Sequence, residues 1–293
     1  MTTNNSKFIY ATVLTLFMVF SISAQKQTNV WSVSDSQGIN AEEVIFQKAI
    51  PKHSVFINLD IQELLRLLVN APKRELSADN EGVVITLPNQ IGDSVSFLVK
   101  EASVMQPELQ AQFPDIRSYI GKGIDNPTAT IRFSVSPQKG LSAMVLSDQK
   151  TVFIEPYAKN SNRYIAFINS TEDGPRESFE CLTESVKSEF NISDEDYIAL
   201  RNADDETLRT YRLALASTVE YSQFHGGTFP SVMAAMNTTM TRVNGIFERD
   251  LGVTMVMVPN TSIIFLGPDV NSDPYSNNNS FALLSQNQTT CDT

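Results

Sequence analysis

The side chains best suited to chemistry in this sequence are two histidines and two cysteines, His53, His225, Cys181 and Cys291. Imidazole nitrogens and thiolates are the usual zinc ligands, and zinc sites place them at short, regular spacings along the chain. These four residues lie far apart without any such spacing. They therefore do not indicate a composite zinc site, and we expect His53 to be structural.

His225 is followed by Gly226 and Gly227, a His-Gly-Gly phrase that some esterases use in an oxyanion hole. Those enzymes also need a nucleophilic serine in a Gly-x-Ser-x-Gly turn. The nearest stretch, Gly-Leu-Ser-Ala-Met at residues 140–144, lacks the last glycine. We expect His225 to lie in a loop, where the glycines form a turn.

Composition excludes several classes of function. The chain has 293 residues with 22 basic and 33 acidic side chains, which gives a net charge of −11. Such a charge repels phosphate backbones, so we expect no nucleic-acid partner. Two cysteines are too few for a disulfide-stapled scaffold.

The N-terminus has the pattern of a secretory signal peptide over residues 1–24. One basic side chain, Lys7, precedes an apolar run at residues 8–20, and Ser23 and Ala24 offer a cleavage site. The run is shorter than the roughly 20 residues of a membrane-spanning helix. We expect a secreted, extracellular protein without a membrane association after signal cleavage.

The elements that must position any site fall into two groups. Residues 44–169 read as short strands, such as 130–136, where Ile131, Phe133 and Val135 alternate onto one face. One helix interrupts them, with Asp60 as its N-cap and Glu63 three residues later. Residues 171–206 are acidic and turn-rich, as is typical of an exposed linker.

A strand-helix-strand pattern follows the linker. It comprises a strand at 209–217, an amphipathic helix at 231–250 and a strand at 253–258, with another strand expected at 261–266. Such a unit is typical of parallel strands joined by a crossover helix. The predicted fold class is α+β, with a β-rich domain before an incomplete α/β domain.

The second group resembles the start of the catalytic domain of secreted bacterial reprolysin-like (adamalysin-type) metzincin zinc metalloproteases. The resemblance rests on three stretches of sequence: residues 209–221, His225-Gly-Gly-Thr228 and residues 240–252. Residues 113–123 and 153–156 are similar to the propeptide of that family. The resemblance implies a propeptide at 25–206, with its β-rich domain extending to about 170, and the N-terminal part of the catalytic domain at 207–293.

The resemblance implies a zinc-dependent endopeptidase that acts on protein or peptide substrates, with contacts between propeptide and catalytic domain. The family's zinc motif, His-Glu-x-x-His-x-x-Gly-x-x-His, does not occur in the 293 residues. We therefore expect an N-terminal fragment of a zymogen, truncated before the zinc motif and inactive by itself. Neither catalytic residues nor metal ligands are predicted within it.

Three interpretations of Cys181 stay open, and the simplest of them is a free thiol. In metzincin zymogens a propeptide thiolate often binds the zinc and displaces the nucleophilic water, and Cys181 is placed for that role. Alternatively, Cys181 forms a disulfide with Cys291 or with a cysteine outside this sequence, as an oxidising compartment permits.

Calcium is a further cofactor that some members of this family bind. Glu248 and Asp250 are the candidate ligands here. Carboxylates two positions apart on a helix point about 200° away from each other, so we favour a solvated helix end over a shared ion.

An alternative function needs no missing segment. An exported, non-enzymatic β-rich binding or adhesion protein would also lack catalytic residues. The strand-helix-strand unit argues against it, because such a unit has no role in a β-rich adhesin.

Overall fold

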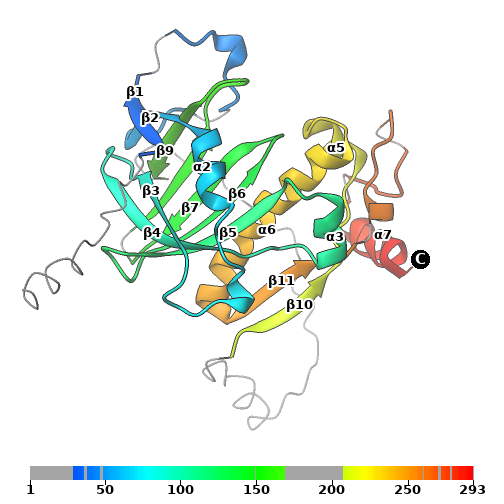
Figure 1. The fold of residues 1–293 in the computed structure, drawn as a ribbon. Coiled ribbons are helices and arrows are strands. Elements are labelled where there is room, and N and C mark those ends of the chain that lie inside the picture. Colours follow the sequence, from blue (N-terminus) through cyan, green and yellow to red (C-terminus); the bar gives the residue numbers. More distant parts are fainter. Residues whose placement is uncertain are drawn as a thin grey trace, which may run out of the picture.

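In the part of the chain that the structure describes, nine of the eleven strands form one antiparallel sheet (Figure 1). The structure is a computed structural model that describes residues 29–35, 38–46, 49–148, 150–168, 207–259, 261–269, 272–277 and 279–292. In sheet order the strands are β1 (Trp31–Ser34), β2 (Ser54–Leu59), β9 (Arg163–Ile168), β8 (Thr151–Pro156), β7 (Gly140–Leu146), β6 (Thr130–Ser136), β5 (Arg117–Gly123), β4 (Ser94–Glu101) and β3 (Val83–Pro88).

The sheet buries one face in an apolar core. On β6 the side chains of Ile131, Phe133 and Val135 are at most 2% exposed and pack in this core, which confirms the predicted alternation. Arg132 and Ser134 point to the opposite face, because successive strand residues alternate. They are nevertheless buried, so a second layer covers that face.

Helix α2 (Ile61–Leu68) closes the apolar core. Its N-cap is Asp60, whose carboxylate accepts a hydrogen bond from the Glu63 amide at 3.0 Å, as the sequence predicts. Leu64 and Leu68 insert into the core, where they meet side chains from the strands.

The second layer is the long helix α6 (Phe229–Leu251), which lies across β5, β6 and β7 (Figure 1). It links β10 (Arg209–Leu213) to β11 (Val253–Met257), and these two strands pair in parallel. The predicted strand-helix-strand unit is therefore confirmed. The helix begins two residues earlier than predicted, since Thr228 and Ser231 form a capping box. It ends at Gly252, whose φ of 62° suits glycine.

Several elements differ from the prediction. The prediction of a strand at 261–266 is wrong. Thr261–Ile263 form the 3-10 helix η4. In this stretch the one β-type contact of the described residues is an isolated bridge between Ser217 and Ile264. The sequence pattern also missed five helical elements. They are α3 (Pro107–Gln112), α5 (Val219–Phe224), α7 (Ser280–Asp292) and the short 3-10 helices η1 (Ala41–Glu43) and η2 (Arg74–Leu76).

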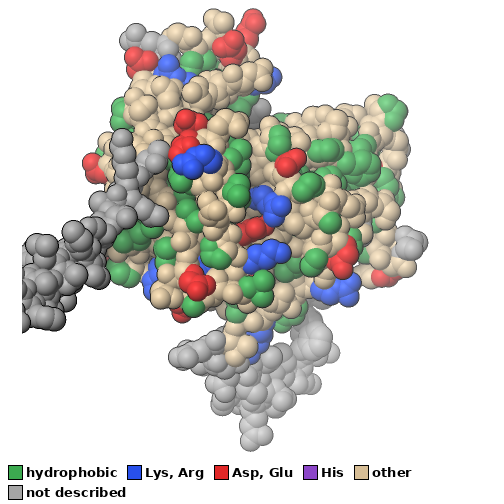
Figure 2. All heavy atoms as spheres, in the orientation of Figure 1, with side chains coloured by type: hydrophobic (Ala, Val, Ile, Leu, Met, Phe, Trp, Pro, Cys, Tyr) green, Lys and Arg blue, Asp and Glu red, His purple; other side chains and the backbone are tan. Residues whose placement is uncertain are grey.

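Charged side chains of both signs are interspersed on the face of the molecule in Figure 2. Among the described residues, no helix has the length and apolar character that crossing a membrane requires.

Candidate functional site

The cysteines and histidines singled out by the sequence do not converge in the described part of the structure. Cys181 lies outside the described residues, as does the predicted signal peptide at 1–24. Cys291 is exposed near the end of α7, with its Sγ 3.9 Å from Asn287 Oδ1. Within the described ranges, no three His, Cys, Asp or Glu side chains are grouped so that they could hold a metal ion.

His225 lies at the C-terminal end of α5, in an aromatic and basic surrounding. Its ring packs edge-on against Tyr221 at 4.5 Å and Phe224 at 4.9 Å between centroids. Lys139 Nζ lies 3.4 Å from His225 Nδ1. Burial, and then the charge of Lys139, lower the pKa of His225. Gly226 and Gly227 follow with positive φ angles, so His225 precedes a turn, as expected.

The most elaborate polar arrangement is the contact between the sheet and α6, which we call the seam. On the sheet it comprises Ser118, Arg132, Ser134, Ser142 and Glu155, and on α6 it comprises Asn237, Thr238, Thr241, Arg242 and Glu248.

Small hydroxyl and amide groups form the middle of the seam. Ser118 Oγ lies 3.0 Å from Asn237 Oδ1 and 2.8 Å from Thr241 Oγ1. Ser134 Oγ lies 2.8 Å from Thr238 Oγ1. Asn237 and Thr241 are each 1% exposed. Buried polar groups cost free energy unless they are paired, so these contacts fix the rotation of α6 on the sheet.

An ion-pair cluster closes the seam at the C-terminal end of α6. Glu248 accepts a hydrogen bond from Arg132 of β6 and one from Arg74 of η2, the latter at 2.7 Å. The side chains of Arg132 and Glu248 are only 5% and 10% exposed. Burial lowers the pKa of Arg132, and the neighbouring carboxylate opposes that shift. Our interpretation of Glu248 as part of a solvated helix end is therefore wrong, because the sheet covers it.

Asp250 behaves as the sequence suggests. It is exposed and pairs with the adjacent Arg249 at 2.6 Å. Glu248 and Asp250 thus bind different arginines and do not point at a shared ion.

A second ion pair joins α6 to β8. Arg242 donates to Glu155 and to Ser142 Oγ, the latter at 2.8 Å. The Arg242 guanidinium also lies 5.7 Å from the centre of the Phe153 ring. Together with the Glu248 cluster, this pair places charged contacts in the C-terminal half of the helix.

Gly245 lets the helix approach the sheet this closely. A Cβ added to it would lie 2.8 Å from Arg132 Cγ and 3.1 Å from Met144 Cε. A larger residue would therefore push the helix away from β6 and β7.

The outer edge of β11, on the side away from β10, is also covered. The Asn244 side chain donates to Met255 O at 2.7 Å and accepts from Met255 N at 3.0 Å. An amide side chain can satisfy both backbone groups of one strand residue, and here it replaces a neighbouring strand.

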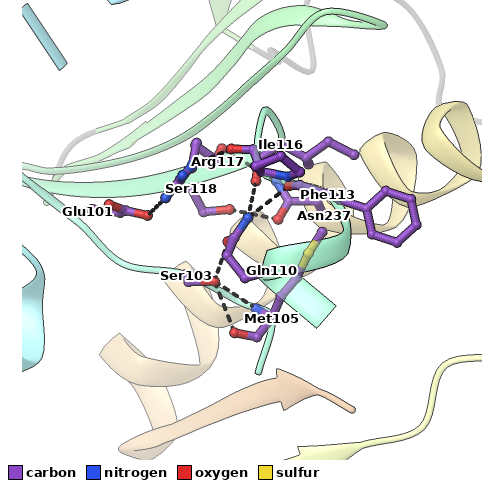
Figure 3. A network of polar contacts seen from close by, with 10 residues as sticks. Glu101, Ser103, Met105, Gln110, Phe113, Ile116, Arg117, Ser118 and Asn237 are labelled. Atoms are coloured by element: carbon purple, nitrogen blue, oxygen red, sulfur yellow. Dashed lines mark hydrogen bonds and ion pairs between the residues drawn. The ribbon is translucent and has the colours of Figure 1, made fainter. Parts of the chain in front are cut away.

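Two positions further, the chain between β4 and β5 covers the same edge. Met257 N donates to Val104 O at 2.8 Å, and Gln106 N donates to Met257 O at 2.9 Å. Polar groups within the same stretch hold its shape, as Figure 3 shows: Gln110 Nε2 donates to Phe113 O and Ile116 O, each at 2.9 Å.

Sequence reasoning missed the seam entirely. The alternation on β6 places Arg132 and Ser134 on one face, but no local signal says that a helix from more than 100 residues downstream covers that face. The ion pair between Arg132 and Glu248 spans 116 positions, a distance that no spacing rule reaches.

In the comparisons with known proteins, a family model matches the C-terminal elements. The family model described as "Metallo-peptidase family M12B Reprolysin-like" matches residues 207–291, which is under a third of the chain. No curated protein matches. A solved structure described as "Structure of a chaperone-substrate complex" is similar at 12% identity over 43% of this chain and 90% of that chain, with a TM-score of 0.27. So low a TM-score supports no argument.

M12B peptidases are zinc-dependent in general and act on protein substrates. The described residues do not fit a zinc site, since they contain no cluster of three suitable ligands. The resemblance inferred from the sequence is supported for the region after the linker. Residues 207–291 are thus similar to the reprolysin-like metallopeptidases of family M12B.

Proposed function

We propose that this chain belongs to the precursor of a secreted zinc metalloendopeptidase. Residues 25–206 are its propeptide, and residues 207–293 are the first part of its catalytic domain. The proposal requires that the zinc ligands and the catalytic glutamate belong to another part of the protein, since residues 1–293 do not contain the family's zinc motif. The family match at residues 207–291 supports the proposal.

The geometric observation that carries the proposal is the contact between the sheet and α6. The polar face of α6 pairs with buried groups on β5 and β6 and with the half-buried Glu155 of β8. Without the sheet, these groups would need other partners. A propeptide with this surface would act as a template on which the first catalytic elements fold.

Zymogen maturation would then be a cut between Ile168 and Thr207. The acidic sequence of residues 193–206 is typical of an exposed segment, where proteases cut most readily.

The test uses the product of the complete gene. We expect it to hydrolyse casein only after cleavage between residues 168 and 207, with activity lost in a chelator and restored by zinc. The chain 25–293 alone serves as control and should be inactive. A complete product without zinc-dependent hydrolysis after cleavage would refute the proposal.

Two roles for Cys181 are compatible with the proposal. If its thiolate silences the zinc, Cys181→Ala in the complete gene product should be active without cleavage. If it forms a disulfide, non-reducing peptide mapping should find it linked to Cys291 or to a later cysteine, and latency should not change.

A further inference from the structure

Residues 102–116, between β4 and β5, leave the sheet and join the C-terminal elements. Met105 forms a parallel bridge with Met257. The two hydrogen bonds around Met257, from its own amide to Val104 O and from the Gln106 amide to its carbonyl, follow the pattern of a parallel strand pair. The segment therefore adds a short third strand beside β11.

The side chains of this segment are part of the same core as α6. Val104, Met105, Leu109 and Ile116 are each at most 3% exposed. Their cluster partners from the C-terminal elements are Val232, Met233, Ala234, Met236, Met240, Met257 and Ile264. Each part of the chain thus supplies one side of a shared apolar core.

The segment has its own internal support, which Figure 3 shows around Gln110. Ser103 Oγ donates a hydrogen bond to Gln110 Oε1 at 2.7 Å, and it accepts one from the Met105 amide at 3.1 Å. At the C-terminal end of the segment, Gln110 Nε2 donates hydrogen bonds to Phe113 O and Ile116 O. The shape that fits β11 and α6 is therefore held by bonds within the segment, which lowers the conformational entropy lost on docking.

We propose that residues 102–116 are a docking element, which holds the sheet on the C-terminal elements after the chain is cut between Ile168 and Thr207. Its binding partner is the surface formed by β11 and the methionine-lined face of α6. None of the contacts above uses the backbone between residues 168 and 207. The product of the cut is thus a non-covalent complex; its role in maturation rests on the proposed function.

The test uses the chain 25–293 with the recognition sequence of a specific protease inserted between residues 168 and 207. After complete cleavage, size-exclusion chromatography at micromolar concentration should show both pieces in one peak, at 0.15 M and at 1 M NaCl. Apolar burial persists in high salt, whereas exposed ion pairs are screened. Separate peaks at either salt concentration would overturn the proposal.

A pair of variants at one position tests the strand contact. Gln106→Pro removes the amide that donates to Met257, and the native φ of −61° already suits proline. Gln106→Ala keeps the amide. We expect Gln106→Pro to weaken the cut complex roughly five- to tenfold relative to Gln106→Ala, as the loss of one hydrogen bond implies. Equal affinities would contradict the strand contact.

A second pair tests the apolar contact. Leu109→Asp should release the C-terminal piece after cleavage, whereas Leu76→Asp, at a side chain that is 83% exposed, should not. The uncut variants are compared first by circular dichroism. If the uncut Leu109→Asp protein is not folded, the comparison of Gln106→Pro with Gln106→Ala decides whether residues 102–116 are the docking element.

These outcomes are independent of catalysis. Retention of the pieces without zinc-dependent hydrolysis by the complete gene product would refute the proposed function alone. Hydrolysis with immediate separation of the pieces would refute the docking element alone.

Discussion

Arg132 of β6 and Glu248 of α6 form an ion pair that joins the sheet to the long helix, with both side chains almost removed from solvent. Arg74 reaches the same carboxylate from η2. Because three separate stretches of the chain meet at one buried charge, the C-terminal elements and the sheet are expected to unfold together.

Glu248→Gln should therefore destabilise the chain 25–293 strongly. It leaves the Arg132 guanidinium buried beside a neutral group, and breaking a buried pair in this way costs about 3–5 kcal/mol. Urea unfolding followed by circular dichroism measures the change.

Asp250→Asn is the matched control, because this carboxylate is exposed at the same helix end. It should leave the midpoint of unfolding unchanged. An equal effect of the two variants would show that the buried cluster contributes nothing specific.

The packing at Gly245 gives a second prediction. Gly245→Val should lower the free energy of unfolding by about 1–3 kcal/mol, as overpacking does, because the new side chain meets Arg132 and Met144. Ile246→Val, at the next and more exposed position, is the control and should change it by less than about 1 kcal/mol. A neutral Gly245→Val would mean that α6 can move away from the sheet freely.

Asn244 supports a third prediction, on the edge of β11. Asn244→Ala leaves the partly buried amide and carbonyl of Met255 without their partner, at a cost of up to about 1–3 kcal/mol for each unpaired group. Hydrogen exchange should show faster exchange of the Met255 amide, while the Val258 amide, which donates to Leu213 O, should change less. Unchanged protection of the Met255 amide would contradict the role of Asn244.

The pKa of His225 gives a pH dependence. Burial and Lys139 lower this pKa in the folded state, so the unfolded chain binds a proton more readily and stability increases with pH. His225 contributes no penalty at neutral pH. The penalty grows as the pH falls through the ordinary histidine value near 6.5, and is complete below the folded-state pKa.

His225→Gln should therefore flatten the decrease in stability between pH 7 and 5. Lys139→Met removes the neighbouring positive charge and should raise the pKa of His225, which NMR titration of the imidazole protons measures. A pKa of His225 that is the same in both proteins would exclude the Lys139 contact.

The elements with strong local patterns could be predicted from the sequence. Asp60 and Glu63 predict a helix start, the alternation of Ile131, Phe133 and Val135 predicts a strand with one apolar face, and Gly252 marks the end of α6. These signals depend on residues within one or two turns of the chain.

The contacts that join the two groups of elements could not be predicted. α6 has apolar residues on one face, but its polar Asn237 and Thr241 are buried as well. Polar residues suggest a solvated face, and only the topology brings Ser118 to them. α7 was missed because its residues have no helical repeat of apolar side chains.

The region after the linker could be identified only through resemblance. No spacing of ligands marks a metallopeptidase in these 293 residues, and the phrases at 209–221 and 240–252 belong to strands and a helix rather than to a catalytic motif. The family match at residues 207–291 supports that interpretation.

The most direct test of the account is a protease assay on the product of the complete gene, cleaved between residues 168 and 207. We predict zinc-dependent hydrolysis of casein that a chelator abolishes and zinc restores, with none from the chain 25–293. No hydrolysis by the cleaved complete product would contradict the assignment as a metallopeptidase precursor.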